Sequence, residues 1–379
     1  MKTDSKIFNI DYNWVDSFWD KIEKKLSVIA PQVKTPFPYF TDKEGNYLTR
    51  NAYWWTNGFW PGMMWLMYIA TKDDKYKTIA ENVENALDEA LYGFDGLDHD
   101  VGFMWLTSAV ANYRITGNEE SKKRGRIAAS VLAGRYNPVG NYIRAWNNRG
   151  DGLDRTGWAI IDCMLNIPLL HWAAEIDNDP RFTNIANNYA NTCMKHFVRP
   201  DGSTNHIVGF SPVTGEVTEI PNGQGYAPDS CWSRGNSWAL YGFTLNYIHT
   251  GNTEYLDTAK KVAHYFLANL DDSGVPRCDF RQPKEPDYRD TTAGACAACG
   301  LIEIAKIGPE AEKELYIHGA VKILKGLEQN CNFSLDNQSI LQNGCVDYHH
   351  ETFGLPIIYG DYYLMEALLK LKGNDILFW

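Results

Sequence analysis

The chain has 379 residues, a formal net charge of −11 at pH 7 and 13% aromatic residues. This length suits two average domains or one large barrel, and because the composition shows no break that would mark a linker, we expect one domain over residues 1–379. The acidic balance, without any Lys/Arg-rich run, excludes nucleic acid or an anionic membrane as the main partner.

Residues 1–6 lead into an amphipathic segment and not into the apolar core of a signal peptide. No stretch approaches the roughly 18 uninterrupted apolar residues of a membrane span. The cysteines are scattered beside apolar neighbours, as is typical of buried thiols, and the CxxC formed by Cys296 and Cys299 has no second pair. These observations predict a soluble, cytoplasmic protein.

The first expected element is an amphipathic helix over about residues 12–30. Five turns follow it along the chain, each with a helix-stop residue and then an acid-rich first turn. They lie at 71–76, 116–120, 177–182, 250–255 and 307–310.

The segment before each turn is rich in Trp, Leu, Met, Ala and Tyr, as in 59–70 and 237–249. The segment after it is more charged, with apolar residues at helical spacing, as in 255–267. Helices that are apolar all round, paired with amphipathic ones, imply an inner ring wrapped by an outer ring. Five such pairs are visible, and the N-terminal helix with a C-terminal one at 362–371 supplies a sixth. An open solenoid has the same periodicity, but the variable spacing and the pairing of the termini favour an all-α fold, a closed (α/α)6 barrel.

Two acids occupy equivalent points of this repeat. Asp100 lies in LDHDVGF (97–103) and Asp162 in IIDCMLN (160–166), and each motif precedes a helix. Loops that enter the inner helices of such a ring converge on one mouth, where a pair of acids suits acid/base chemistry on a sugar. The other mouth segments carry Arg, Gln, Trp and further acids: 53–60, 143–146, 224–238, 288–292 and 359–363.

Each of these side chains also has a plain structural interpretation. Asp162 is either a general acid or an N-terminal helix cap, and Asp100 either a second catalytic acid or a turn residue. Arg234 has the planar donor fork that suits a carboxylate; the alternative is a surface ion pair, which its position between Trp232 and Trp238 disfavours. The same choice, between stacking on sugars and packing the core, holds for Trp55, Trp146 and Trp238.

His99 and His206 are of a residue type that binds metals. No HxxxH pair or clustered acid accompanies them in the sequence. We therefore expect them to donate hydrogen bonds to sugar hydroxyls, and we expect neither a metal nor another cofactor.

The segments WTNGFWPG, HDVGF, IIDCMLNIPLL, YRDTTA and GDYYLMEALL, with the Gln/Trp/Arg/Trp segment at 224–238, cover nearly the whole chain. Together they resemble the unsaturated glucuronyl hydrolases of glycoside hydrolase family 88. The resemblance implies an (α/α)6 barrel that removes the 4,5-unsaturated uronic acid which polysaccharide lyases leave on glycosaminoglycan fragments. It implies Asp100 and Asp162 as the two catalytic aspartates. It also implies these residues in or near the sugar cleft: Trp55, His99, Trp146, His206, Gln224, Trp232, Arg234 and Trp238.

The chain departs from the family's pattern in three places. Members often have two His before the first catalytic Asp, where only His99 stands here, and an Arg common before the second motif is replaced by Trp158-Ala159. Members that accept sulfated disaccharides have a Ser- and Lys-bearing stretch before the GDYY motif, but this chain reads DYHHE at 347–351. The second departure bears on how the uronate is held, and the third on sulfate preference.

The implied substrate is an enol ether, and its productive first step is protonation at C4. Asp162 lies between Ile161 and Cys163 in an apolar run, where desolvation raises a carboxyl pKa and keeps the proton available. We expect Asp162 to protonate C4 and then to help activate water for attack at C5. We expect Asp100 to hold substrate hydroxyls and to tune the proton affinity of its partner.

Three other functions remain open. An unsaturated rhamnogalacturonyl hydrolase shares the fold and chemistry but acts on pectin fragments. A sugar epimerase on the same barrel needs paired His bases at the mouth, where this chain has acids. A noncatalytic glycan-binding scaffold binds the sugar and leaves it intact. The sequence indicates neither the aglycone nor the oligomeric state.

Overall fold

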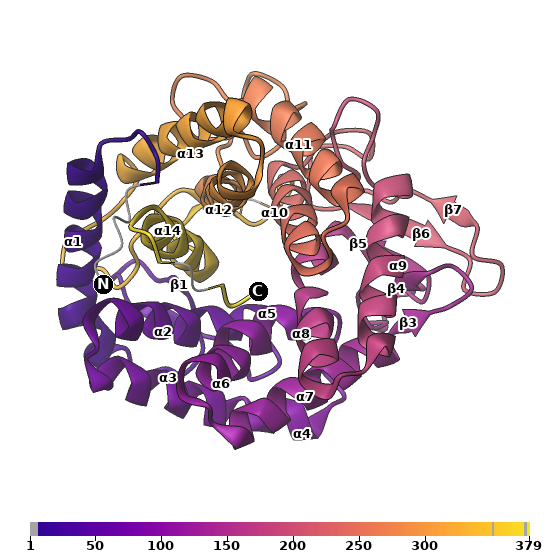
Figure 1. The fold of residues 1–379 in the computed structure, drawn as a ribbon, viewed down its shortest axis with the longest axis horizontal. Coiled ribbons are helices and arrows are strands. Elements are labelled where there is room, and N and C mark those ends of the chain that lie inside the picture. Colours follow the sequence, from indigo (N-terminus) through magenta and orange to yellow (C-terminus); the bar gives the residue numbers. More distant parts are fainter. Residues whose placement is uncertain (1–6, 351, 375–376) are drawn as a thin grey trace.

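The computed structural model describes residues 7–350, 352–374 and 377–379, and they form two concentric rings of helices (Figure 1). The inner ring consists of α2 (Phe59–Thr71), α5 (Val101–Trp105) with its continuation α6 (Ala111–Thr116), α8 (Pro168–Asp177), α10 (Ser233–Thr250), α12 (Thr291–Ile307) and α14 (Ile358–Leu371). The outer ring consists of α1 (Tyr12–Ile29), α3 (Asp74–Ala86), α7 (Glu119–Gly134), α9 (Pro180–His196), α11 (Thr253–Ala268) and α13 (Lys313–Glu328), with the short α4 (Asp88–Gly93) after α3. This is the (α/α)6 barrel that the sequence predicts.

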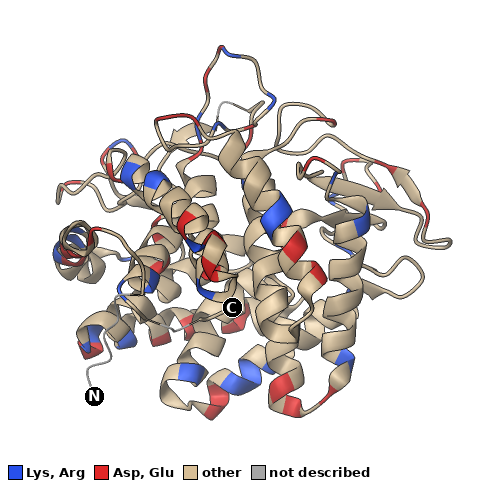
Figure 2. Ribbon diagram, turned by 45° about the horizontal axis from the view of Figure 1, so that its top comes forward, with Lys and Arg blue, Asp and Glu red and all other residues tan. Residues whose placement is uncertain are grey.

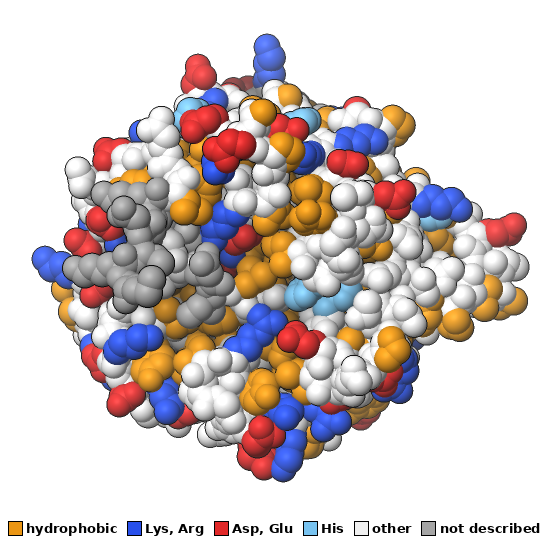
Figure 3. All heavy atoms as spheres, in the orientation of Figure 1, with side chains coloured by type: hydrophobic (Ala, Val, Ile, Leu, Met, Phe, Trp, Pro, Cys, Tyr) orange, Lys and Arg blue, Asp and Glu red, His pale blue; other side chains and the backbone are white. Residues whose placement is uncertain are grey.

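The division between the rings follows charge. Helix α2 has no charged residue, and α10 has only Arg234, so these helices can be surrounded by protein on all sides. Figure 2 shows Lys, Arg, Asp and Glu gathered on the outer helices and loops. On the face seen in Figure 3, acidic and basic side chains are interspersed over the coloured surface. An anionic ligand must therefore be held by local cations.

The predicted turns are confirmed at four of the five positions. A left-handed residue ends each inner helix, and a side chain caps the outer helix that follows. The left-handed residues are Lys72, Gly117, Asn178 and Gly251, and the caps are Asp73, Asn118, Asp179 and Asn252. The fifth turn differs because Gly308 has extended backbone and a 3-10 turn, Glu310–Glu312, precedes α13.

Short antiparallel strands occupy the loops, where the sequence analysis expects no strands. They are β1 (Pro38–Thr41) with β2 (Tyr47–Thr49), β3 (Tyr136–Asn137) with β4 (Tyr142–Ile143), and β8 (Gly344–Cys345) with β9 (Phe353–Leu355). A three-stranded sheet joins β5 (Trp158–Ile160), β6 (Ile207–Phe210) and β7 (Val217–Glu219). Its register pairs Ile160 with Ile207, so the sheet brings the segment before Asp162 beside the segment after His206.

The start of the last helix differs from the prediction and changes an assignment. Helix α14 begins at Ile358, so residues 359–363, expected as a rim loop, lie inside it. Asp361 is buried there and accepts hydrogen bonds from the Tyr47 hydroxyl and from two backbone N–H groups at 340 and 341. It holds loops together and does not reach the mouth as a free acid.

One cluster of buried apolar residues runs from Phe8 to Trp379 and so joins both ends of the described chain. The outer helix α1 is fastened by the Trp14 indole N–H, which donates to Glu328 (2.7 Å), and by the Lys25 ammonium, which donates to the carbonyl of Asn332 (2.7 Å). The cysteines are all unpaired. Among the described residues, no helix is long and apolar enough to cross a membrane. Residues 1–6, which contribute to the cytoplasmic prediction, lie outside the described part.

Candidate active site

A cleft of about 750 Å³ opens where the loops enter the inner helices. Each wall comes from a segment that directly precedes or begins an inner helix, which is how residues far apart in sequence converge on one mouth. Seven of the ten predicted site residues line it: Trp55, Asp100, Trp146, Asp162, Gln224, Trp232 and Arg234.

Asp162 lies in a 3-10 turn, η4 (Ile161–Leu165), between β5 and α8. The residue before this turn, Ile160, makes no side-chain cap, and Asp162 Oδ1 has no hydrogen-bond partner among the described residues. Burial raises the pKa of Asp162 to about 7, although the positive charge of Arg234 opposes the shift. Asp162 is therefore not the helix cap of the structural interpretation, and near neutral pH it exchanges a proton readily.

Asp100 immediately precedes α5 and makes no side-chain cap there. Its Oδ1 lies 3.4 Å from His99 Nε2 and accepts a hydrogen bond from Asn166 Nδ2 (3.3 Å). Burial raises its pKa well above the ordinary value, and the nearby charges of Asp98 and Asp162 raise it further. The charge of Asp162 thus acts on Asp100, and the pKa values of both predicted acids are raised.

Asn166 connects the two acid-bearing motifs. Its amide donates to Asp100 Oδ1 and to the carbonyl of Asp162, both at 3.3 Å, while its Oδ1 accepts the N–H of Phe103 at 2.8 Å. The motifs approach this closely because Gly102 has no side chain: a Cβ there would lie 2.4 Å from Asn166 Cα. The sequence motif contained Asn166, but its bridging role depends on a contact across 63 residues.

His206 faces Asp162 across the cleft floor. Its Nδ1 accepts the backbone N–H of Gln224 at 3.0 Å, so in the neutral ring the proton is on Nε2. Nε2 lies 3.6 Å from Asp162 Oδ1, and neither atom has a hydrogen-bond partner among the described residues. Burial lowers the pKa of His206 to about 3, with the charge of Arg234 adding to the effect, so the ring is a neutral donor. Two unsatisfied polar atoms that face each other indicate a place for a ligand group or water.

Arg234 is fully buried at the start of α10. Its Nη1 donates to Asp290 Oδ2 (2.5 Å) and to the carbonyl of Cys345, and its Nη2 donates to the carbonyl of Val346 (2.7 Å). The guanidinium lies over the Trp232 ring at 4.3 Å, and Nε has no partner among the described residues. Arg234 does form an ion pair, with Asp290, but this pair is buried and does not lie at the surface. The Nε side of the guanidinium stays without a partner in the described part of the chain.

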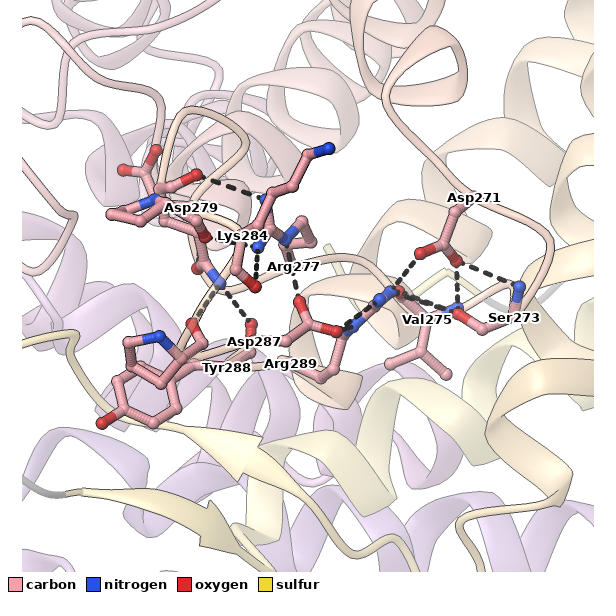
Figure 4. Close-up of polar contacts among 12 residues, drawn as sticks. Asp271, Ser273, Val275, Arg277, Asp279, Lys284, Asp287, Tyr288 and Arg289 are labelled. Atoms are coloured by element: carbon pink, nitrogen blue, oxygen red, sulfur yellow. Dashed lines mark hydrogen bonds and ion pairs between the residues drawn. The ribbon is translucent and has the colours of Figure 1, made fainter.

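The loop before α12 supports this arrangement. Arg277 and Arg289 both pair with Asp287, and Arg289 Nη1 also lies 2.7 Å from Asp271 Oδ2 (Figure 4). This bracing leads directly to Asp290, the residue that caps α12 and holds Arg234. A second hollow, of about 440 Å³, lies beside the same loop and is separate from the cleft.

The aromatic residues divide between the cleft wall and the core. Trp146 is half-buried beside Trp158, and Trp55 packs on Phe103 with ring centroids 5.3 Å apart. Both present part of a ring to the cleft, as a sugar platform requires. Trp238 does not line the cleft: it is fully buried and packs on Phe103 from behind. Residue type and spacing alone could not distinguish the tryptophans at the cleft from the one in the core.

His99 and His206 lie just below the lining, and Gln224 donates through its backbone N–H to His206 and through its side-chain amide to the carbonyl of Val346. Sequence reasoning assigned no role to several further lining residues, among them Tyr39, Arg50, Trp54, Asp98 and Asp347. Of these, Trp54, Asp98 and Asp347 stand in segments that the sequence analysis singles out, whereas Tyr39 and Arg50 carried no signal.

The potential metal ligands are closer together than the sequence analysis expects. One ligand atom each from Asp98, His99 and Asp100 lies within 4.8 Å of the others. These atoms already engage one another, since Asp98 Oδ1 accepts the N–H of Asp100 (3.0 Å) and His99 Nε2 approaches Asp100. The absence of a cofactor stays a prediction.

Comparison with known proteins identifies the family. The sequence model of Glycosyl Hydrolase Family 88 matches residues 33–373. The chain belongs to this family. It is 36% identical over 352 residues to the unsaturated glucuronyl hydrolase of Bacillus sp. (strain GL1), covering 90% of this chain and 93% of that protein. It is 34% identical over 368 residues to the unsaturated chondroitin disaccharide hydrolase of Streptococcus pneumoniae, covering 95% and 92% of the two chains.

Solved structures of family 88 members have the same fold. The unsaturated glucuronyl hydrolase of Streptococcus agalactiae superimposes with a TM-score of 0.90 at 32% identity, covering 98% of this chain and 94% of that one. A mutant of that protein complexed with dGlcA-GalNAc6S superimposes with a TM-score of 0.82 at 31% identity, covering 96% and 93%. As a family 88 member, this chain is a glycoside hydrolase, and its cleft contains Asp100 and Asp162, both with raised pKa values, and Arg234, whose Nε has no partner among the described residues.

Proposed function

We propose that the chain, acting as one catalytic domain over residues 1–379, releases the 4,5-unsaturated uronic acid from the non-reducing end of lyase-generated glycosaminoglycan oligosaccharides. The observation that carries the proposal is Asp162: a cleft carboxyl with an unpartnered oxygen and a pKa near 7. The names of the relatives support the substrate class.

The reaction starts with proton transfer from Asp162 to C4 of the C4=C5 double bond. Positive charge then develops on C5 and the ring oxygen, and water adds to C5 while the Asp162 carboxylate takes up one of its protons. The product is a hemiketal at C5; cleavage of its bond from C5 to the ring oxygen gives a ketone at C5 and a hemiacetal at C1, which collapses to an aldehyde and releases the aglycone as an alcohol. No nucleophile attacks C1 in this reaction. The distances between the two carboxyl groups that distinguish retaining from inverting glycosidases therefore need not apply.

The other residues hold the sugar for this step. The Nε2–H of His206 and the carboxyl of Asp100 hydrogen-bond to sugar hydroxyls, and the free edge of Arg234 binds the uronate carboxylate. Trp55, Trp146 and Trp232 supply apolar faces for the ring. His99 and Trp238 act from behind the lining, through Asp100 and Phe103.

We also propose a cytoplasmic location. Its support is chemical: the unpaired cysteines match a reducing compartment.

A disaccharide panel tests the function. Loss of the enoate's near-UV absorbance is measured on lyase-derived glycosaminoglycan and pectin disaccharides, with and without prior exhaustive chelation. We expect loss on glycosaminoglycan disaccharides, unaffected by chelation because proton transfer to an enol ether needs no metal. Turnover of pectin disaccharides alone would point to a rhamnogalacturonyl hydrolase. Binding without loss of absorbance would leave only a glycan-binding scaffold.

A further inference from the structure

Two arginines at the cleft are exceptions within the molecule. Every other arginine donates a hydrogen bond or forms an ion pair through its guanidinium, whereas Arg50 and Arg149 have neither with any residue in the described part of the chain. Both line the active-site cleft. A guanidinium is always charged and has five N–H donors, so an unpartnered one beside a cleft is suited to an anionic ligand.

Arg50 is the more extensively packed of the two. It follows β2, and its backbone N–H donates to the carbonyl of Phe37 at 3.0 Å. Its guanidinium packs against the rings of both Tyr39 and Trp54, at 4.5 and 4.6 Å from their centroids, and these two rings contact each other edge-on. Nε is buried and has no hydrogen-bond partner among the described residues. The aromatic faces hold the planar group in one orientation and remove part of its water, which strengthens its attraction for an anion.

Arg50 belongs to a different part of the cleft wall from Arg234, whose guanidinium packs on Trp232 and Tyr359 at 4.3 and 5.4 Å. The cation whose charge reaches Asp162 is Arg234, and the cation that reaches Asp100 is Arg135. The charges of Arg234 and Arg50 both reach Tyr39, where they lower its pKa against the larger effect of burial. With the unsaturated uronate placed at Asp162 and Arg234, Arg50 faces the next sugar.

The charge of the neighbouring cleft wall limits which segment can bind an anionic group. The β8–β9 hairpin carries Asp347 at the cleft, and hydrogen bonds from His350 and Thr352 help to keep its pKa below the ordinary value against burial. This charged wall repels an anion, so an anionic group on the second sugar needs a cation from another segment. The β1–β2 segment supplies one in Arg50.

We propose that Arg50 binds a sulfate group on the sugar attached to the unsaturated uronate, and so determines acceptance of sulfated disaccharides. This inference rests on the proposed function and assigns a further binding residue to the same site. An oxyanion accepts two parallel N–H bonds from an arginine edge, and Arg50 has such an edge unused.

The test compares one unsaturated chondroitin disaccharide with its sulfated form. Arg50→Gln should raise KM for the sulfated form roughly tenfold to a hundredfold, the range for loss of a charge-assisted hydrogen bond, and leave the unsulfated form within about twofold. Arg50→Lys keeps the charge but loses the fork, so it should fall between wild type and Arg50→Gln.

Arg149→Gln is the matched control. Arg149 is also unpartnered and lines the cleft, but it is solvent-exposed with only Trp146 beneath it at 5.3 Å. An exposed, flexible cation contributes little, so both substrates should stay within about threefold. Turnover of the unsulfated disaccharide and a thermal melt report whether each variant is folded.

The outcomes separate this inference from the proposed function. Equal losses on both disaccharides in Arg50→Gln would mean that Arg50 holds the uronate or merely packs the wall, and would overturn the inference. So would wild-type turnover of the unsulfated form alone. If wild type turns over neither disaccharide, the proposed function fails as well.

Discussion

At the scale of single residues, the site is defined by polar atoms without partners. Asp162 Oδ1, His206 Nε2 and Arg234 Nε are all buried and have no hydrogen bond among the described residues. Each such group costs folding free energy, on the order of 1–3 kcal/mol, for as long as no partner satisfies it. Their convergence on one cleft therefore indicates groups kept ready for a ligand.

Asp162→Asn tests the proton donor directly. The change keeps the shape of the side chain but removes its transferable proton, and general acid catalysis typically contributes about 10²–10⁴-fold. We expect a loss of turnover within this range while the unsaturated disaccharide still binds, measured by enoate absorbance and by calorimetry. Asp100→Asn should also lose most activity, because Asp100 shares the cleft with Asp162, whose charge helps to raise the pKa of Asp100. Near wild-type turnover in Asp162→Asn would remove it from the catalytic role.

The raised pKa of Asp162 predicts two pH effects. As a proton donor it must be protonated, so kcat/KM should fall as the pH rises through about 7. The folded state also holds this proton above the ordinary value of 3.8, so its contribution to folding stability decreases as the pH rises between about 4 and 7. Asp162→Asn should therefore melt above wild type at pH 8 and near it at pH 4. An equal difference at both pH values would contradict the shift.

Arg234→Lys should affect more than the binding of the uronate carboxylate. A lysine keeps one charge near Asp290 but cannot also serve the two carbonyls and a uronate. We expect a higher KM together with a lower melting temperature, because a buried network is left partly unsatisfied. A rise in KM with an unchanged melt would mean that the contacts of Arg234 with the hairpin at 344–355 are not structural.

At the scale of elements, the sequence predicts those features that are determined by side chains close together in the chain. The turns after α2, α6, α8 and α10 are predictable because each has its own cap within two residues of the turn. The strands are not, since pieces of two to four residues have no readable alternation and depend on distant partners. The same distinction applies within the site: the acids of the two motifs could be found, but the pairing of Arg234 with Asp290, 56 residues away, could not.

Gly102→Ala tests whether the approach of two elements positions the acids. The added Cβ would meet the backbone and side chain of Asn166 at 2.4 to 2.7 Å, so η4 and α5 must separate. We expect overpacking to cost about 1–3 kcal/mol and to reduce kcat, because Asn166 bridges Asp100 and Asp162. Melting temperature and single-turnover rate are the measurements.

The control for this variant is Gly134→Ala at the end of α7. A Cβ there meets nothing within 4 Å, so both quantities should stay near wild type or stability should rise slightly. If Gly102→Ala matches this control in rate and melt, the spacing of the two motifs does not depend on the glycine.

At the scale of the whole molecule, the two rings surround an aromatic centre that the end of the described chain completes. Trp379 is fully buried and stacks on Tyr363 with ring centroids 5.7 Å apart, while its indole N–H donates to Glu366 at 2.8 Å. Its ring also lies 6.1 Å from Phe103, which packs against Trp55 at the cleft. The inner helices and the cleft floor thus share one packed unit around the barrel axis.

Trp379→Ala should therefore destabilise the barrel as a whole. Removing a buried tryptophan costs roughly 3–5 kcal/mol, and Glu366 loses a donor as well. We expect a clearly lower melting temperature and a smaller fall in turnover, because Phe103 loses support behind the cleft while the acids themselves are untouched. Trp379→Phe keeps a ring but not the N–H, so it should lie between the alanine variant and wild type. Tyr92→Ala, at a side chain that is 67% exposed, is the matched control and should change stability by no more than about 0.5 kcal/mol. If thermal melts of Trp379→Ala and Tyr92→Ala coincide, the centre of the barrel is held without Trp379, and the cleft floor does not depend on it.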